Sequence, residues 1–66
     1  MNRIFDGVNR EGDIIFIDFE NVFLIQKQES TVKIVSTGAA ICTLDLKEYE
    51  RFKNEYLEYH NTKEIY

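Results

Sequence analysis

Five short apolar segments, separated by clusters of turn-forming residues, occupy the first 44 positions of the chain. The clusters contain Asn, Asp, Gly and Ser, which favour turns and commonly separate strands. The segments themselves are rich in Val, Ile, Phe and Thr, the side chains that favour extended backbone. The pattern predicts a meander of antiparallel strands within residues 3–44, with strands at 3–8, 14–19, 22–28, 31–36 and 40–44.

After residue 45 the spacing of apolar positions changes to that of a helix. Asp45 is a suitable N-cap, and Glu48 three residues later forms a capping-box-like pair with it. We predict one amphipathic helix over about residues 46–60 and a flexible tail at 61–66. Its apolar side comprises Leu46, Tyr49, Phe52, Tyr56, Leu57 and Tyr59, and its polar side comprises Lys47, Glu50, Arg51, Asn54, Glu55 and Glu58.

These elements define a single small α+β domain over residues 1–66: an antiparallel β-meander of four or five strands, closed by one C-terminal helix. A chain of 66 residues buries a small core, and such domains commonly depend on a disulfide, a metal or a partner chain. Cys42 is the only cysteine and His60 the only histidine, so neither an internal disulfide nor a structural zinc site is expected. Association with another chain is therefore the expected source of extra stability.

Two of the strands carry large apolar side chains on both faces. Successive side chains of a strand point to opposite faces, and one helix covers one face of a sheet only. We therefore expect a homo-oligomer, most simply a dimer, in which a second copy covers the other face. A strongly twisted sheet that curls over and buries these side chains within one chain is the alternative. The opposed sets are Ile14 and Phe16 against Ile15, Ile17 and Phe19, and Val22 and Leu24 against Phe23 and Ile25.

The residues offer little for catalysis. Cys42 lies in an apolar strand, where a cysteine usually behaves as a core residue with a raised pKa. The carboxylate pairs Asp18/Glu20 and Glu48/Glu50 lack the apolar setting that tunes acid-base groups. We predict that the protein is not an enzyme and has no catalytic residues, no metal and no cofactor.

Charge and hydropathy restrict the partners. The net charge of −4 argues against nucleic acid, because affinity for phosphates requires clustered Lys and Arg. No apolar run approaches the roughly 18–20 residues of a membrane span, and no basic start is followed by an apolar stretch and a small-residue cleavage site, so a cytoplasmic location is expected.

Aromatic side chains are the best candidates for a protein interface, because they supply large contact areas. The expected partner or oligomer interface comprises Phe16, Phe23, Ile25, Phe52, Tyr56 and Tyr59. A polar pocket for an anion such as a nucleotide is the second possibility, with Arg3, Arg10, Lys53 and His60 as its contacts.

From Ile4 to Leu57 the chain resembles small flagellar proteins of the FlbD type in layout. A short strand and turn lead to two apolar strands, then to Thr31-Val32-Lys33-Ile34 where that family has a Thr-Val-Ile-Thr-Leu-like strand, and then to a Gly turn, a strand and a charged helix. This resemblance implies an accessory role in a large assembly.

The composition is also similar to that of small proteins carried by phages and mobile elements of low-GC bacteria: acidic, rich in Asn, Lys, Glu, Ile and Tyr, and free of Trp and Pro. That resemblance implies stoichiometric inhibition of a host protein or defence system in the host cytoplasm, or sequestration of a nucleotide. Our main hypothesis is a non-enzymatic inhibitor that binds a host protein by surface occlusion.

Overall fold

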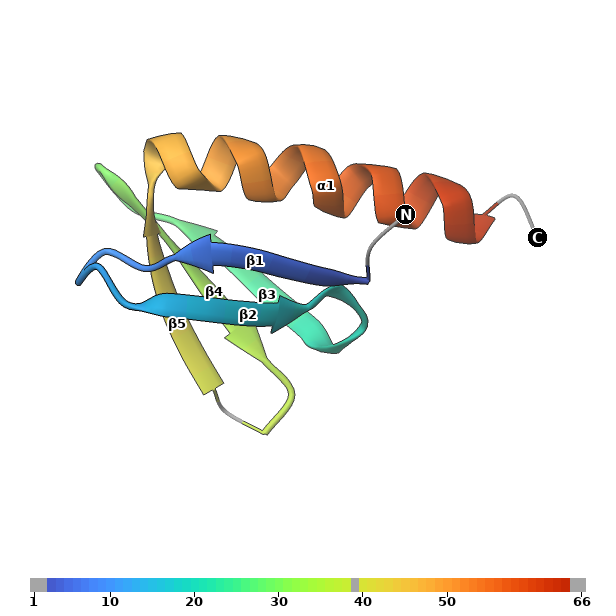
Figure 1. The fold of residues 1–66 in the computed structure, drawn as a ribbon, viewed down its shortest axis with the longest axis horizontal. Coiled ribbons are helices and arrows are strands. Elements are labelled where there is room, and N and C mark those ends of the chain that lie inside the picture. Colours follow the sequence, from blue (N-terminus) through green and yellow to red (C-terminus); the bar gives the residue numbers. More distant parts are fainter. Residues whose placement is uncertain (1–2, 39, 65–66) are drawn as a thin grey trace.

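The computed structural model describes residues 3–38 and 40–64, and its elements follow the predicted order (Figure 1). The strands and the helix confirm the predicted α+β meander, and each strand begins and ends within one residue of its predicted limits. The elements are β1 (Ile4–Val8), β2 (Ile14–Asp18), a 3-10 turn η1 (Phe19–Asn21), β3 (Val22–Lys27), β4 (Thr31–Ser36), β5 (Ala40–Asp45) and α1 (Leu46–Glu64).

The helix is longer than predicted. It continues through residues 61–64, where a flexible tail was expected, while residues 65–66 of that tail lie outside the described residues. The backbone N–H of Glu48 donates to Asp45 Oδ1 at 2.8 Å, which confirms Asp45 as the cap. The Glu48 carboxylate does not complete a capping box, because it accepts a hydrogen bond from strand β1 instead.

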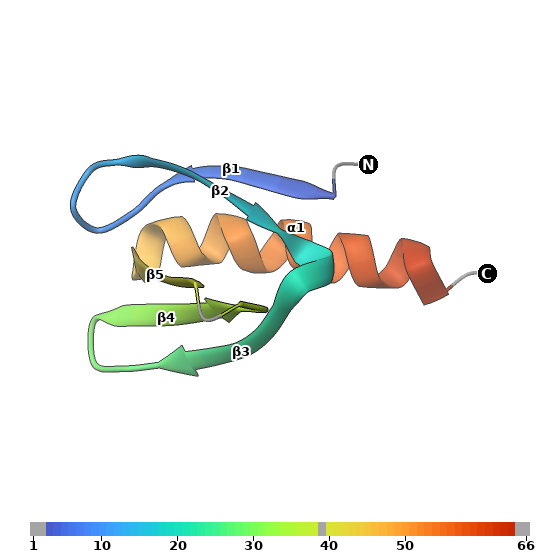
Figure 2. The ribbon, with the colours of Figure 1, turned by 90° about the horizontal axis from the view of Figure 1, so that it is seen from below.

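The meander is divided into two sheets, β1–β2 and β3–β4–β5, both antiparallel. The chain changes direction at η1, where the Asp18 side chain accepts the Glu20 backbone N–H at 3.0 Å. In Figure 2 the hairpin and the three-stranded sheet lie on opposite sides of the axis of α1. The backbone N–H of Arg10 donates to the Thr43 carbonyl at 2.8 Å and ties the hairpin loop to β5. The meander therefore folds over as two sheets and not as one curled sheet. The burial within one chain that the alternative interpretation required is incomplete, because Ile14, Phe16 and Phe23 stay exposed.

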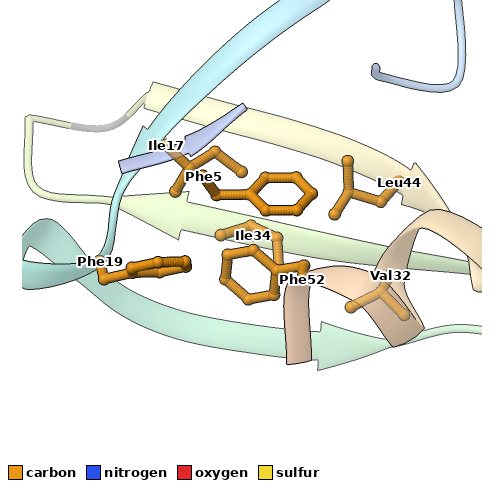
Figure 3. Close-up of a cluster of buried hydrophobic side chains, with 7 residues drawn as sticks. All are labelled: Phe5, Ile17, Phe19, Val32, Ile34, Leu44 and Phe52. Atoms are coloured by element: carbon orange, nitrogen blue, oxygen red, sulfur yellow. The ribbon is translucent and has the colours of Figure 1, made fainter. Parts of the chain in front are cut away.

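The core lies between the two sheets and α1 (Figure 3). The Phe52 ring stands at its centre, with its centroid 5.2 Å from that of Phe5 and 5.5 Å from that of Phe19. Burial of a side chain of this size contributes about 1.5–3 kcal/mol. Each sheet and the helix contribute, since the buried set is Phe5, Ile17, Phe19, Val32, Ile34, Leu44 and Phe52.

Candidate interaction surface

The outward side of the β1–β2 hairpin is an apolar surface, here called the hairpin face. Its side chains alternate with the buried ones along both strands. The two most exposed members lie on β2, where Ile14 is 73% and Phe16 is 69% exposed. Val8 lies directly opposite Ile14 and is 44% exposed, and Ile4 at the other end of β1 is 42% exposed. Four large apolar side chains of one hairpin are thus left in contact with water.

Two carboxylates share the hairpin face and behave differently. Asp18 forms an ion pair with Arg3 at 2.8 Å, and this hydrogen-bonded guanidinium lowers the pKa of the Asp18 carboxyl. Arg3 also lies 3.2 Å from Glu20, so its charge is balanced by two acids. Asp6 lies opposite Phe16 and is exposed, and it forms no ion pair with any other residue in 3–38 or 40–61. Asp6 therefore places a negative charge among apolar side chains. The pKa of Arg51 is raised mainly by Glu48, and the charge of Asp6 contributes to this rise.

The outward side of the three-stranded sheet is less apolar. One row across it joins Leu24, Val35 and Ile41, of which Ile41 is 62% and Leu24 is 46% exposed. The next aligned row, Gln26, Lys33 and Thr43, is polar. Phe23 is 71% exposed and lies where a bulge shifts the register of β3 between Val22 and Leu24. The hairpin face carries four exposed large apolar side chains, against three on this sheet, and is accordingly the stronger candidate.

Two side chains of α1, Glu48 and Arg51, close the outer edge of β1; we call this pair the edge clamp. Glu48 Oε2 accepts the backbone N–H of Val8 at 2.7 Å, and Arg51 Nη2 donates to the carbonyl of Asp6 at 2.7 Å. The two side chains also form an ion pair at 3.1 Å. Arg51, together with the Val8 N–H, lowers the pKa of the Glu48 carboxyl, while that carboxylate raises the pKa of Arg51.

The sequence assigns Arg51 to the polar side of the helix, but the structure places its guanidinium against strand β1. Its guanidinium carbon lies 4.7 Å from the centroid of the Phe5 ring, so the charge also covers the outer end of the core. A cation over an aromatic face is attracted by the ring quadrupole. The sequence holds no local sign of this contact, because Asp6 and Arg51 are 45 positions apart.

The predicted interface residues fall into two groups. Phe16 and Phe23 are exposed, as an interface requires, and Ile25 is half-buried against the core. Phe52 is 0% exposed, so it belongs to the core of its own chain and is not available to a partner. The reason is that α1 lies across both sheets, so the middle of its apolar side fills the space between them.

The helix tyrosines also pack inward. The Tyr56 ring stacks on Phe52 with centroids 5.5 Å apart, and the Tyr59 centroid lies 5.6 Å from that of Phe19. Both tyrosines remain half-buried, with part of each ring at the surface. They can form only the margin of an interface.

The four predicted anion contacts are not brought together. Arg3 and Arg10 lie at opposite ends of β1, and Arg3 is already ion-paired. On the helix, Lys53 lies 3.5 Å from Glu50, and the His60 ring packs edge-on against Tyr56 with centroids 4.5 Å apart.

An open hollow of about 230 Å³ lies where β1 meets the start of α1. Its lining includes two carboxylates and one cation, a composition unsuited to an anion. The lining residues are Val8, Asn9, Asp45, Lys47 and Glu48.

The predicted interface omits exposed apolar residues of the two sheets, among them Ile4, Val8, Ile14 and Ile41. The sequence did contain a sign that Ile14 could be exposed. Ile14 and Phe16 lie on one face of a strand whose other face carries Ile15 and Ile17, and one helix covers one face only. Ile4 and Val8 flank Asp6 in a short segment, so the same alternation there is weak.

Scanning protein-family models, curated proteins and solved structures found no match to this chain. Among residues 3–38 and 40–64, no helix has the length and apolar character needed to cross a membrane, and no three His, Cys, Asp or Glu side chains are grouped to hold a metal ion.

Proposed function

We propose that this chain is a non-enzymatic interaction protein that associates with copies of itself and occludes a surface of a protein partner through the hairpin face. The observation that carries the proposal is the exposure of Ile14 and Phe16, at 73% and 69%, in a domain whose core is built without them. Large apolar side chains grouped on one surface are typical of interaction sites.

The size of the hairpin face supports this role. At roughly 150–200 Å² for each side chain of this size, the exposed fractions of Ile4, Val8, Ile14 and Phe16 leave on the order of 400 Å² of apolar surface in water. A standard interface buries about 800 Å² on each partner, of which somewhat more than half is apolar. The hairpin face thus supplies most of the apolar area that one such interface requires.

Asp6 restricts the chemistry of the partner. A carboxylate buried without a partner costs several kcal/mol. A protein docked flat on the hairpin face must therefore bring a Lys or Arg side chain to Asp6, or leave that position at a hydrated rim. We expect a partner surface with an apolar centre and a basic residue.

A non-enzymatic role is supported by the state of the reactive groups. Burial, and to a lesser extent the charge of Glu11, raises the pKa of the Cys42 thiol, so its thiolate fraction at neutral pH is small. The carboxylates with lowered pKa values, Asp18 and Glu48, are both held by arginines. The pKa values of all three groups are shifted away from 7, so none of the three is adjusted for proton transfer near pH 7.

The test uses affinity capture with a face variant and a matched control. Ile4→Thr with Val8→Thr makes the β1 half of the hairpin face polar while keeping β-branched side chains. Leu57→Gln changes a side chain of similar exposure, at 51%, on the helix. We expect the wild type and Leu57→Gln to bind the same partner with equal affinity, and the double variant to bind it at least about tenfold more weakly.

Equal binding by all three proteins, with unchanged melting temperatures, would remove the hairpin face as the binding surface. The identity of the captured protein separates the two classes that the sequence resembles. A single host enzyme or defence protein fits the inhibitor, whereas subunits of a large assembly fit the flagellar accessory role.

A further inference from the structure

The two sheets have four outer edges, on β1, β2, β3 and β5, and three of them carry a feature that hinders further strand pairing. The edge clamp closes β1, the bulge between Val22 and Leu24 distorts β3, and the Arg10 N–H occupies the Thr43 carbonyl on β5. Natural sheets protect exposed edges by such cover, bulges and charges. Within the part of the chain that the structure describes, no bulge interrupts β2, no backbone hydrogen bond beyond its pairing with β1 engages Ile14–Asp18, and its one charged residue, Asp18, is ion-paired.

The pairing pattern determines which backbone groups of β2 are free. Asp6 and Val8 direct backbone groups away from β2, because these groups bond to Arg51 and Glu48. In an antiparallel ladder, residues opposite such positions also direct their backbone groups outward. Phe16 lies opposite Asp6 and Ile14 opposite Val8, so the N–H and C=O groups of both face the open edge. Asp18, two residues further along β2, has the same orientation.

We propose that β2 pairs with β2 of a second copy of this chain, edge to edge and antiparallel, about a two-fold axis at Phe16. The two hairpins then form one four-stranded sheet with β2 and its counterpart at the centre. This inference rests on the proposed function for the association of copies, and it names the site.

The sequence of β2 is complementary to itself in this arrangement. Phe16 lies opposite Phe16 of the partner subunit, and Ile14 lies opposite Asp18 of the partner subunit. Each of these pairs exchanges two backbone hydrogen bonds, so every outward group of the strand finds a partner. No two acidic residues of the strands lie directly opposite each other, and Asp18 keeps its ion pair with Arg3.

Asp6 favours this arrangement over packing of two hairpin faces on each other. Face-to-face packing of two copies buries two Asp6 carboxylates that form no ion pair within residues 3–38 and 40–61, which is unfavourable. Edge pairing leaves Asp6 in water. It also brings the hairpin faces of the two subunits side by side and doubles the apolar surface offered to a protein partner.

The first experiment follows the wild-type protein by sedimentation equilibrium and by amide hydrogen exchange over a range of concentrations. We expect a dimer mass, with protection of the Ile14 and Phe16 amides rising at least about tenfold between dilute and concentrated protein. The Val8 amide, bonded to Glu48 within one chain, is the internal control and should not change. A monomer mass at the highest concentration, or unchanged protection of both β2 amides in the dimer, would overturn the proposal.

The second experiment separates the edge from the side chains. N-methylation of the Phe16 amide removes the outward donor and keeps the ring, and ligation at Cys42 makes a synthetic chain of 66 residues accessible. We expect this protein and Phe16→Lys to be monomers, and Phe23→Lys, which alters an equally exposed aromatic, to remain a dimer. A dimer that survives N-methylation, in a protein with an unchanged circular dichroism spectrum, contradicts edge pairing.

The two proposals fail separately. A monomeric wild type that still binds a partner through Ile4 and Val8 refutes edge pairing and self-association, and leaves the docking role standing. A β2-paired dimer that binds no partner refutes the docking role only.

Discussion

Both sides of the β1–β2 hairpin carry large apolar side chains, but their surroundings are opposite. On the inner side, Phe5 and Ile17 lie directly opposite each other and are 0% and 5% exposed. On the outer side, Val8 and Ile14 are also paired, at 44% and 73% exposure. The difference shows that hydrophobic residues in this hairpin have two different settings: the inner set builds the core, and the outer set is exposed to water.

The largest expected effect is on the inner side, at Phe5. Phe5→Ala removes a ring that contacts Phe19 and Phe52 and supports Arg51, so we expect a loss of about 3–5 kcal/mol in the free energy of unfolding. Urea denaturation followed by circular dichroism measures it. A loss below about 1 kcal/mol would contradict the division of the hairpin into core and surface sides.

A smaller effect is expected at Gly7, which lies on the inner side of β1. A Cβ at this position would lie 2.7 Å from Cζ of the buried Phe5 ring and 3.0 Å from Glu48 Oε2. Gly7→Ala should therefore destabilise the domain by about 1–3 kcal/mol through overpacking. The check is a double-mutant cycle with Phe5→Leu, in which the cost of the added methyl group should fall. An equal cost in both backgrounds would show that the ring is not the obstacle.

The edge clamp should contribute less. Glu48→Gln keeps the shape of the side chain and loses the ion pair with Arg51, and we expect a cost of about 1 kcal/mol at pH 7, because the arginine is half exposed. The folded-state pKa of Glu48 lies below its ordinary value of 4.5, so its contribution is present above pH 4.5 and is lost as the pH falls through the folded pKa.

Melting temperatures between pH 7 and 3 test this assignment. The wild type should lose more stability than Glu48→Gln as the pH falls below 4.5, while Asp18, whose pKa is also lowered, contributes equally to both proteins. Parallel curves for the two proteins would show that Glu48 does not hold β1.

The smallest effect on folding is expected on the outer side, at Phe16. Phe16→Ala should change the stability of the dissociated monomer by no more than about 0.5 kcal/mol, since the ring is 69% exposed. Denaturation at low protein concentration isolates the monomer, and the same variant should weaken association at high concentration. A loss comparable to that of Phe5→Ala would mean that the outer side also belongs to the core.

Most of the local structure was predictable from the sequence. The strands follow from β-branched and aromatic residues between turn formers, and the start of the helix follows from Asp45, whose side chain bonds the Glu48 amide three residues later. The helix end was misplaced at residue 60, because the chain from Asn61 has no strong stop signal such as Gly or Pro.

The candidate site was predictable only in part. Phe16 was identified as exposed, but Phe52 was assigned to the same interface and is the centre of the core. A helical repeat shows which residues share a side of a helix, yet it does not show which of them lie nearest the sheets. The predicted anion site also depended on distances that spacing along the chain does not supply.

The sequence by itself determined where the strands and the helix lie and that some strands are apolar on both faces, because these properties depend on neighbours a few residues apart. The tertiary structure alone decided that the chain turns at η1 into two sheets, that Ile17 faces the core while Phe16 faces water, and that Arg51 reaches the Asp6 carbonyl to close the edge of β1. These outcomes depend on contacts between residues up to 45 positions apart, and such contacts leave no trace in a local pattern.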